Sequence, residues 1–392
     1  MGYLRDATEL MEREAAVLAP YAVHSKDCAG REYPEPEAEA RTPFQRDWHR
    51  ITHSQGFRKL EFKTQVFVYG EGGEYGDVIR NRLTHTLEVS QIATSLARSL
   101  GLNEDLASAV ALAHDLGHTP FGHSGEEELK TLVPTFNHNV HSLRIVRELE
   151  RRYPGFPGLN LTLDTLEGIE KHETDYDRVG SFKYNPGLMP PLEAQVVSVS
   201  DITAFRAHDV EDSLVTGILK PEDYRAAGLL LWDQTYEPLQ DIADCRVRMA
   251  QLARGLIDTL VADVRAETQH RLTEAGIHAL QQVREFPGNL VGFSRELAGH
   301  LSALGEFLYE YFYRNWRIVR MTNKGKMMVR RLFEEYCAHP EILPAEVARD
   351  YSSAARRGKE EARLVLADYV AGMTDRYATE EYLRLFEVGH PV

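Results

Sequence analysis

Six side chains that could ligate a metal ion or transfer protons stand out between positions 85 and 126. They are His85, His114, Asp115, His118, His123 and Glu126. A neutral imidazole and a carboxylate together suit a divalent cation such as Mn²⁺, Mg²⁺, Fe²⁺, Co²⁺ or Zn²⁺. His114 and Asp115 are adjacent, and at the end of a helix they can converge on one cation. Two ligands do not hold a metal firmly, so this pair needs partners from elsewhere in the chain.

His85 and Asp201 are the partners that the sequence offers. His85 lies in an otherwise apolar helical pattern, where a buried imidazole needs a hydrogen bond or a metal. Asp201 lies among valines, where an unpaired charge would be costly. Each residue alone is more often an ordinary hydrogen-bonded core residue than a ligand. The joint pattern is more specific, and it predicts a metal site made by His85, His114, Asp115 and Asp201.

Two consecutive helices are expected to position the first part of this set. Leucines recur at helical spacing over residues 80–101, and Gly101 ends the pattern. Asn103 is a favourable N-cap for a second helix with an apolar stripe. We expect His114 and Asp115 to lie in the last turn of that second helix.

A break follows this helix, because Gly117, Pro120 and Gly122 occur close together. We therefore expect His118 and His123 to lie on a turn just beyond the helix end. Loops held by rigid elements are frequent places for binding and catalysis.

The remainder of the chain is predicted to be mostly helical. Further helices are expected over residues 1–21, 138–153, 162–172, 191–214 and 220–340, with a helical pair after Pro344. Irregular segments are expected at 22–42, at the Gly-rich residues 70–77, and at 173–191, which could serve as a lid. The fold class is therefore all-α. We divide it into an N-terminal arm (1–40), a metal and catalytic core (41–215) and a C-terminal helical region packed on that core (216–392).

Composition narrows the class of protein. The formal net charge is −15, which argues against a general binder of nucleic acid, because phosphate neutralisation needs clustered Lys and Arg. The basic segment 41–63 is more simply explained as a solvated helical face. There is no apolar run long enough for a membrane span and no secretory signal, and the three cysteines form no CxxC pair. We expect a cytoplasmic protein.

Several longer motifs resemble those of one known family. They are RTPFQRD (41–47), HSQGFRKLEFKTQVF (53–67), NRLTHTLEVSQIA (81–93), LAHDLGHTPFGHSGE (112–126), GLNLTLDTLEGI (158–169), EAQVVSVSD (193–201), YRNWRIVRMTNKGK (313–326) and DYVAGMTDRYA (368–378). Together they resemble the dNTP triphosphohydrolases, or dGTPase-like proteins, of the HD-domain superfamily. The resemblance implies an HD-domain helical core with additional N- and C-terminal helices.

The resemblance also implies a reaction, which is hydrolysis of a deoxynucleoside triphosphate to the deoxynucleoside and tripolyphosphate. It implies one divalent metal per site, held by the four ligands named above. It assigns catalytic or triphosphate-lining roles to His118, His123, Glu126 and His138. It assigns substrate contacts to Arg58, Gln65, Arg82 and Asp209, with Gln65 and Asp209 at the sugar 3′-hydroxyl and Arg82 at phosphate. Similar proteins are commonly oligomers, often hexamers, and some have a second, activating nucleotide.

The chemistry fits these residue types. Attack at the α-phosphorus expels a 5′-alkoxide, which is a poor leaving group at neutral pH, and imidazole has a suitable pKa for donating the proton. We expect His123 to be this general acid, with Glu126 orienting it or the attacking water. His118 and His138 are then expected to bind phosphate, although these roles are interchangeable on the sequence alone.

The chain departs from the family pattern near two of these residues. Ile202 and Phe205 follow Asp201 where the family often has an acidic residue and a Tyr, and FNHNVHS replaces FEHNEQS around His138, which introduces Asn137, Val140 and His141. These changes motivate an alternative, which is a nucleotide-binding regulatory protein with little turnover or a phosphohydrolase of a related nucleotide.

Overall fold

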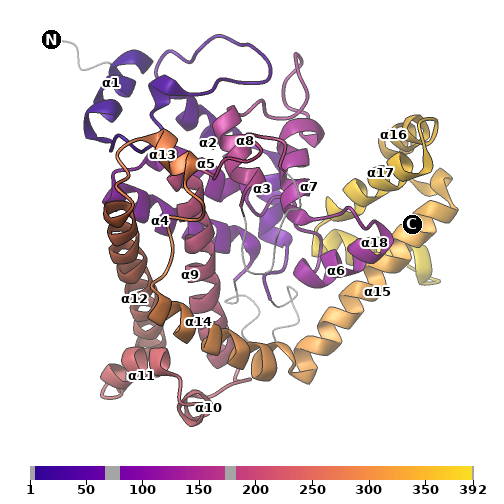
Figure 1. Cartoon of the computed structure of the whole chain (residues 1–392). Coiled ribbons are helices and arrows are strands. Elements are labelled where there is room, and N and C mark those ends of the chain that lie inside the picture. The colour runs from indigo at the N-terminus through magenta and orange to yellow at the C-terminus, as the bar shows by residue number, and fades with distance from the viewer. Residues whose placement is uncertain (1–4, 67–79, 173–181, 391–392) are drawn as a thin grey trace. The chain divides into compact units, whose positions relative to one another are not determined.

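Helices and short turns make up this computed structural model, which describes residues 5–66, 80–172 and 182–390 (Figure 1). Within these ranges, pairing between extended segments is limited to isolated bridges, so the protein is all-α as predicted. The α-helices are α1 (Ala7–Val17), α2 (Pro43–Thr52), α3 (Gln55–Lys59), α4 (Arg82–Leu100), α5 (Glu104–Ala113), α6 (Gly122–Leu132), α7 (His138–Arg144), α8 (Leu163–Glu170), α9 (Leu192–Val215), α10 (Pro221–Ala226), α11 (Leu230–Tyr236), α12 (Cys245–Glu274), α13 (Leu280–Glu285), α14 (Arg295–Leu308), α15 (Trp316–Ala338), α16 (Ala345–Ala355), α17 (Lys359–Ala371) and α18 (Asp375–Phe386). Two π-helical segments, η4 (Ile145–Leu149) and η6 (Tyr309–Tyr313), follow α7 and α14.

The chain forms two compact units that are interleaved along the sequence. Unit 1 comprises Met1–Ser54, His85–His114 and Val146–Asn315, and unit 2 comprises Gln55–Thr84, Asp115–Ile145 and Trp316–Val392. The peptide bond between His114 and Asp115 is one of the points where the chain leaves one unit and enters the other.

The core of unit 1 is built around α5 and α9. Helix α5 is buried on almost every side, and this explains why its sequence is so rich in alanine, leucine and valine. Asn103 accepts a hydrogen bond from the N–H of Leu106 at 3.1 Å and caps α5 as predicted. Near the start of α9, the buried Glu193 accepts hydrogen bonds from the backbone N–H groups of Val23 at 2.9 Å and of Asn103 at 3.1 Å. This carboxylate therefore ties the N-terminal arm and the start of α5 to α9.

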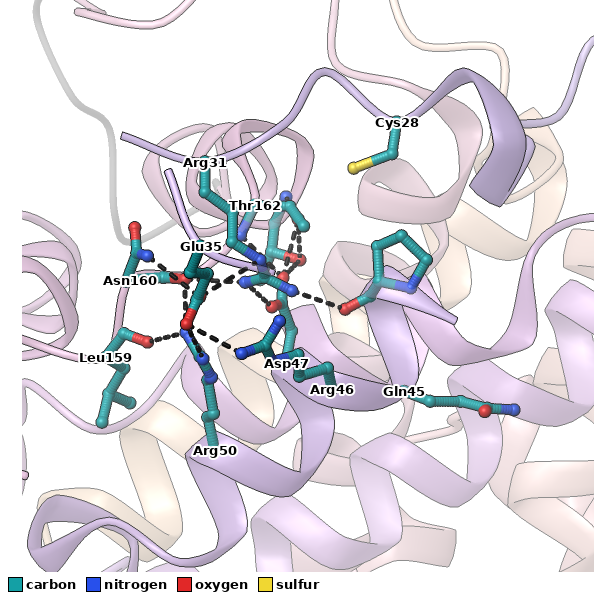
Figure 2. A network of polar contacts seen from close by, with 12 residues as sticks. Cys28, Arg31, Glu35, Gln45, Arg46, Asp47, Arg50, Leu159, Asn160 and Thr162 are labelled. Carbon is teal, nitrogen blue, oxygen red and sulfur yellow. Dashed lines mark hydrogen bonds and ion pairs between the residues drawn. The ribbon is translucent and has the colours of Figure 1, made fainter. Parts of the chain in front are cut away.

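A buried polar network fixes the irregular arm of unit 1 (Figure 2). The Asp47 carboxylate, which is fully buried, accepts hydrogen bonds from Arg31 at 2.5 Å and from the N–H and hydroxyl of Thr162 at 2.8 and 2.7 Å. Glu35 pairs with Arg46 at 2.8 Å and with Arg50 at 2.7 Å. The RTPFQRD motif thus joins the arm to the segment that precedes α8.

The core of unit 2 packs α6 against α15, with α17 and α18 on α15. Its buried apolar side chains include Phe121, Leu129, Leu332 and Val370. Gly325 lies directly against the Phe121 side chain, because a Cβ at that position would meet Phe121 Cβ and Cγ at 2.8 Å. Residues of the C-terminal segment therefore support the turn that begins α6.

The structure confirms the predicted helices at 80–101 and 191–214 as α4 and α9, but it corrects three details. Helix α5 ends at Ala113, so His114 is its C-cap and Asp115 lies beyond it, rather than in the last turn. His123 lies inside α6 and not on the turn, because Phe121 adopts a left-handed conformation (φ 63°) from which the helix restarts at Gly122. The helix predicted at 138–153 is a short α-helix followed by a π-helical turn. The Gly-rich loop at 70–77 and residues 173–181 of the expected lid lie outside the described residues.

Candidate metal centre and catalytic turn

In unit 1, three imidazoles surround the Asp201 carboxylate. His85 Nε2 lies 3.0 Å from Asp201 Oδ1, His114 Nε2 lies 3.8 Å from the same oxygen, and His172 Nε2 lies 3.5 Å from Oδ2. The ligand atoms of His114, His172 and Asp201 are close enough to one another to hold one metal ion. Three residues predicted as ligands, His85, His114 and Asp201, are thus brought together by α4, the end of α5 and α9.

Local structure orients His114 within this cluster. Its Nδ1 lies 2.6 Å from the carbonyl oxygen of Ala111, one turn earlier on the same helix. A carbonyl can only accept, so Nδ1 carries the proton and Nε2 is left with the lone pair. That lone pair is on the nitrogen nearer Asp201, which is the arrangement that a metal ligand requires.

The electrostatics keep Asp201 ionised. Burial acts to raise the pKa of its carboxyl group, but the hydrogen bonds from His172 and His85 and the nearby His114 outweigh burial and hold the pKa well below its usual range. Imidazoles beside an ionised carboxylate are a donor set that divalent transition metals favour. The residues present therefore fit the divalent ion that the sequence predicts.

The sequence reasoning missed His172. This residue follows α8 and is buried, with Nε2 toward Asp201 and Nδ1 3.4 Å from the Ser198 hydroxyl. The only sequence signal was a histidine directly after an apolar helix, which is too common a pattern to single it out. Asp201 and Ser198 are three residues apart on α9, so both nitrogens of His172 face the same helix.

In unit 2, the Asp115 carboxylate lies between a guanidinium and an imidazole. It accepts a hydrogen bond from Arg82 Nη1 at 2.7 Å, and its other oxygen is 3.0 Å from His118 Nε2. Arg82 is almost completely buried, and within the described residues its Nε and Nη2 atoms have no hydrogen-bond partner. A buried cation with two unused donors is suited to an anionic ligand such as a phosphate.

The remaining predicted catalytic residues gather around Glu126 on α6. The His118 and His138 rings are stacked with centroids 3.9 Å apart, and the His123 ring stands edge-on to His118 at 5.0 Å. His138 Nδ1 lies 2.9 Å from Glu126 Oε2, and the backbone N–H of His138 donates to Glu126 Oε1 at 3.0 Å. Of the three imidazoles, His118 and His138 are buried, whereas the His123 side chain is 47% exposed.

These groups shift each other's pKa values. Burial acts to raise the pKa of Glu126, but His138, His118 and His123 together hold it well below its usual range. Burial is the main cause that holds the pKa of His118 well below 6.5, and the neighbouring Arg82 and His138 lower it further. At neutral pH the cluster therefore holds an ionised Glu126 and a neutral His118.

The turn that carries His118 is held by contacts from outside its own helix. Lys63 Nζ donates hydrogen bonds to the carbonyl oxygens of His118 and Ala371, the latter at 3.0 Å. Burial, together with the nearby Lys59, lowers the pKa of Lys63 to about 7. The Asp375 carboxylate accepts hydrogen bonds from the N–H groups of Phe121 and Thr64.

The predicted substrate contacts lie in different surroundings. Gln65 is half-buried, and its side-chain oxygen has no hydrogen-bond partner in the described part of unit 2. Arg58 is an exposed residue of α3. Asp209, in unit 1, is fully buried and accepts a hydrogen bond from the Tyr313 hydroxyl at 2.7 Å. Burial raises the pKa of Asp209 to about 7, although Tyr313 and Arg206 act to lower it.

Two of the departures from the family pattern have clear surroundings. The Phe205 ring, which lacks a hydroxyl, stacks on Tyr313 with ring centroids 6.4 Å apart, so a hydroxyl is present nearby and is directed at Asp209. His141 is buried, and its Nδ1 lies 2.9 Å from the carbonyl oxygen of Gly117. Burial lowers the pKa of His141 to about 3.

Known proteins match this chain over nearly its whole length. An HD-domain model matches residues 82–206, and a phosphohydrolase-associated domain model matches residues 291–384. A deoxyguanosinetriphosphate triphosphohydrolase-like protein of Geobacter metallireducens is 41% identical over 98% of this chain and 99% of its own length. Proteins with the same description from Bordetella pertussis and Caulobacter vibrioides are 42% and 40% identical, over 98% and 94% of this chain and 100% and 96% of their own lengths.

The chain belongs to the deoxyguanosinetriphosphate triphosphohydrolase-like family of HD-domain proteins. The HD-domain match begins at Arg82 and ends at Arg206, so it includes the three imidazoles and the carboxylate of the candidate metal centre and the whole of α6. Membership makes a phosphohydrolase the expected class of enzyme, with a metal held by buried His and Asp residues. No helix in the described ranges has the length and apolar character needed to cross a membrane.

Proposed function

We propose that this protein hydrolyses deoxynucleoside triphosphates to deoxynucleosides and tripolyphosphate with one bound divalent metal. The observation that carries the proposal is the buried Arg82, which pairs with Asp115 and has two further donors unused among the described residues. A buried guanidinium with unused donors, in the same unit as the acid–base side chains of His118, His123, Glu126 and His138, is suited to binding and cleaving a phosphate ester. The names of the 40–42% identical relatives make deoxyguanosine triphosphate the first substrate to test.

The proposed metal ligands are His85, His114, Asp115 and Asp201. His85, His114 and Asp201 lie close together within unit 1. Asp115 directly follows His114 in the chain. When bound, a divalent ion at such a site neutralises phosphate charge and lowers the pKa of water. Asp115 would then serve two purposes, because its carboxylate also aligns Arg82 and His118.

Different residues of unit 2 bind the phosphate groups and donate the proton to the leaving group. Arg82 offers its unused N–H groups to phosphate oxygens. His118 and His138, stacked and buried, offer N–H donors to the triphosphate. His123 is the accessible imidazole of the three, and we assign it the proton that the 5′-oxygen needs as it leaves. Glu126 holds His138 through two hydrogen bonds and lies within 3.9 Å of His123 Nδ1.

Product analysis tests the reaction directly. The four dNTPs and the ribonucleotides are incubated with purified protein and Mn²⁺ or Mg²⁺, and the products are separated by chromatography. We expect a deoxynucleoside and tripolyphosphate. Release of dNMP and pyrophosphate as the sole products would contradict the proposal.

Two variants separate metal binding from proton transfer. Asp201→Ala is expected to lose both the bound metal and turnover. His123→Ala is expected to retain the metal, measured by elemental analysis, while turnover falls by about 10²- to 10⁴-fold, the usual contribution of a general acid. Full activity of His123→Ala would assign the proton to another imidazole.

The second candidate is a nucleotide-binding regulatory protein with little turnover, motivated by Ile202, Phe205 and Val140. Tight dGTP binding with metal present and no product over hours would favour it. The Tyr313 hydroxyl at Asp209 weakens this alternative, because it supplies a hydroxyl beside the ring of Phe205. The hexameric state and the activating nucleotide that the family resemblance implies stay predictions.

A further inference from the structure

Behind the candidate ligand His85, a row of side chains runs through unit 1 toward the surface. His85 Nδ1 lies 3.4 Å from His208 Nδ1, and His208 Nε2 is in direct contact with the Glu88 carboxylate. Glu88 is one turn after His85 on α4, and His208 is seven residues after Asp201 on α9. His208 is buried, whereas the Glu88 side chain is 40% exposed.

A single arrangement of protons satisfies this row once His85 acts as a ligand. Without a metal, His85 Nε2 faces the Asp201 carboxylate as a hydrogen-bond donor. Once His85 ligates a metal through this nitrogen, Nε2 must keep its lone pair and Nδ1 must carry the proton. The Nδ1 proton then requires an acceptor, and His208 Nδ1 provides it. His208 must in turn carry its own proton on Nε2, where the Glu88 carboxylate accepts it.

We infer that Glu88 and His208 are positioning residues that fix the tautomer and ring orientation of His85 for metal binding. Ligating histidines nearly always donate their second N–H to a carboxylate, a carbonyl or water, and these outer partners hold the ring and raise its basicity. Here the acceptor is a second imidazole, which is itself oriented by a carboxylate. The inference rests on the proposed function, because it assumes that His85 ligates a metal.

The other members of the cluster show why His85 depends on this row. His114 is oriented by a backbone carbonyl of its own helix, which any sequence would supply. His85 instead relies on a side chain from α9 that lies 123 residues away in sequence. Removing His208 therefore takes away the side-chain acceptor that fixes the His85 tautomer and ring orientation. The effect should appear as weaker metal binding, even though neither Glu88 nor His208 touches the metal.

The test measures metal affinity without any substrate. Metal-free full-length protein is titrated with Mn²⁺ by calorimetry, and Co²⁺ absorption reports the coordination geometry. His208→Phe keeps a ring of similar shape but removes the acceptor, and we expect the dissociation constant to rise about 10- to 100-fold. His208→Asn can restore an acceptor through its amide oxygen, and we expect it to recover most of the affinity. Glu88→Ala, at a partly exposed position, is expected to give an intermediate dissociation constant.

Glu104→Ala is the matched control. Glu104 is a carboxylate of unit 1 that pairs with Arg98 at the surface, at 2.5 Å, and its loss should leave the metal dissociation constant unchanged. Circular dichroism of each variant confirms that the helical fold is retained.

The outcomes separate the inference from the proposed function. Wild-type affinity in both His208→Phe and Glu88→Ala overturns the inference while leaving the metal centre intact. An equal loss in His208→Phe and His208→Asn also overturns it, because a merely structural role for the ring would give that result. A wild-type protein that binds metal but releases no product from dNTPs refutes the proposed activity alone. A wild-type protein that binds no divalent ion overturns both.

Discussion

The Asp375 carboxylate accepts a hydrogen bond from the backbone N–H of Phe121 at 2.8 Å. Its second oxygen accepts from the N–H of Thr64 at 2.9 Å and from the Thr64 hydroxyl. Phe121 is the left-handed residue from which α6 begins, and Thr64 precedes Gln65. One carboxylate from α18 therefore fixes two segments of unit 2 that carry predicted site residues, although Asp375 is far from them in sequence.

Substituting Asp375 tests this relationship. Asp375→Asn cannot accept at both positions, because one oxygen becomes a donor that faces a backbone N–H. We expect turnover to fall by about 10²-fold, since displacements of about 1 Å can cost that much, while KM changes less. The Tm is also expected to fall, since an unsatisfied buried group costs about 1–3 kcal/mol. Steady-state kinetics and thermal unfolding measure the two effects.

Tyr336→Phe is the control for that variant. It removes a partly buried hydrogen bond to Glu381 in the same unit, at 2.8 Å, without touching the turn. A similar loss of turnover in both variants would show that general destabilisation explains the result.

The buried His141 predicts acid-sensitive stability. Its pKa is about 3 in the folded protein and about 6.5 when unfolded, so between these pH values the unfolded chain binds more protons. Stability from this residue is therefore complete above pH 6.5 and is lost as the pH falls, by about 1.4 kcal/mol per pH unit. His141→Asn can still donate to the Gly117 carbonyl but cannot titrate. We expect it to reduce the slope of the unfolding free energy against pH by about 1.4 kcal/mol per pH unit, which corresponds to one proton.

Urea denaturation at pH 7.5, 6.0 and 5.0 measures these slopes. His270→Asn, at an exposed position of α12, is the control and should leave the slope unchanged. Parallel curves for wild type and His141→Asn would show that His141 does not titrate with unfolding.

Asp209 predicts selectivity for the sugar 3′-hydroxyl. If its carboxylate contacts that group, wild-type protein should prefer a dNTP over the 2′,3′-dideoxy analogue, and Asp209→Asn should reduce the ratio of kcat/KM values by about tenfold or more. The Tyr313 hydrogen bond favours the ionised form, so Tyr313→Phe should raise the pKa of Asp209 above its value of about 7. The pH profile of the ratio should then shift upward.

Tyr309→Phe tests whether that shift is specific, because Tyr309 is exposed in the same aromatic segment. If wild type and Asp209→Asn give the same ratio of kcat/KM for the dNTP and its dideoxy analogue, Asp209 does not contact the 3′-hydroxyl.

Breaking the polar network of Figure 2 is expected to lower the free energy of unfolding strongly. Asp47→Ala leaves Arg31 and the Thr162 N–H without their buried acceptor, and breaking one partner of a buried ion pair costs about 3–5 kcal/mol. Glu37→Ala, at an exposed position of the same arm, should cost less than about 0.5 kcal/mol. Urea unfolding measures both, and equal midpoints would contradict the assignment.

The sequence allowed the proximity of three proposed metal ligands to be predicted because each of them carries a local signal. His85, His114 and Asp201 each stand out as a polar residue in an apolar helical pattern, and the structure places them together. His172 and His208 also make close contacts in the cluster. His172 lies after the end of α8 and His208 lies in a polar stretch of α9, so neither interrupts an apolar helical pattern.

The supports of the turn could not be predicted for a different reason. Asp375 and Lys63 act on backbone groups of residues that are far from them in sequence, and backbone partners leave no mark on residue type. The interleaving of the two units is equally hidden, because periodicity describes single helices and not which of them share a core. The turn is shorter than the sequence predicts, because an αL residue that is not glycine leaves no signal in the sequence.

The length of α9 has a consequence for the size of the ligand. Asp201 and Asp209 lie on one uninterrupted helix of 24 residues, and eight residues correspond to about 12 Å along its axis. A single molecule that contacts both carboxylates must therefore be elongated parallel to the helix, as a sugar joined to a phosphate chain is and a lone phosphate ion is not. Inserting one residue between them would turn Asp209 by about 100° around the axis. The helix thus sets both the spacing and the rotational phase of the two carboxylates that such a molecule would contact.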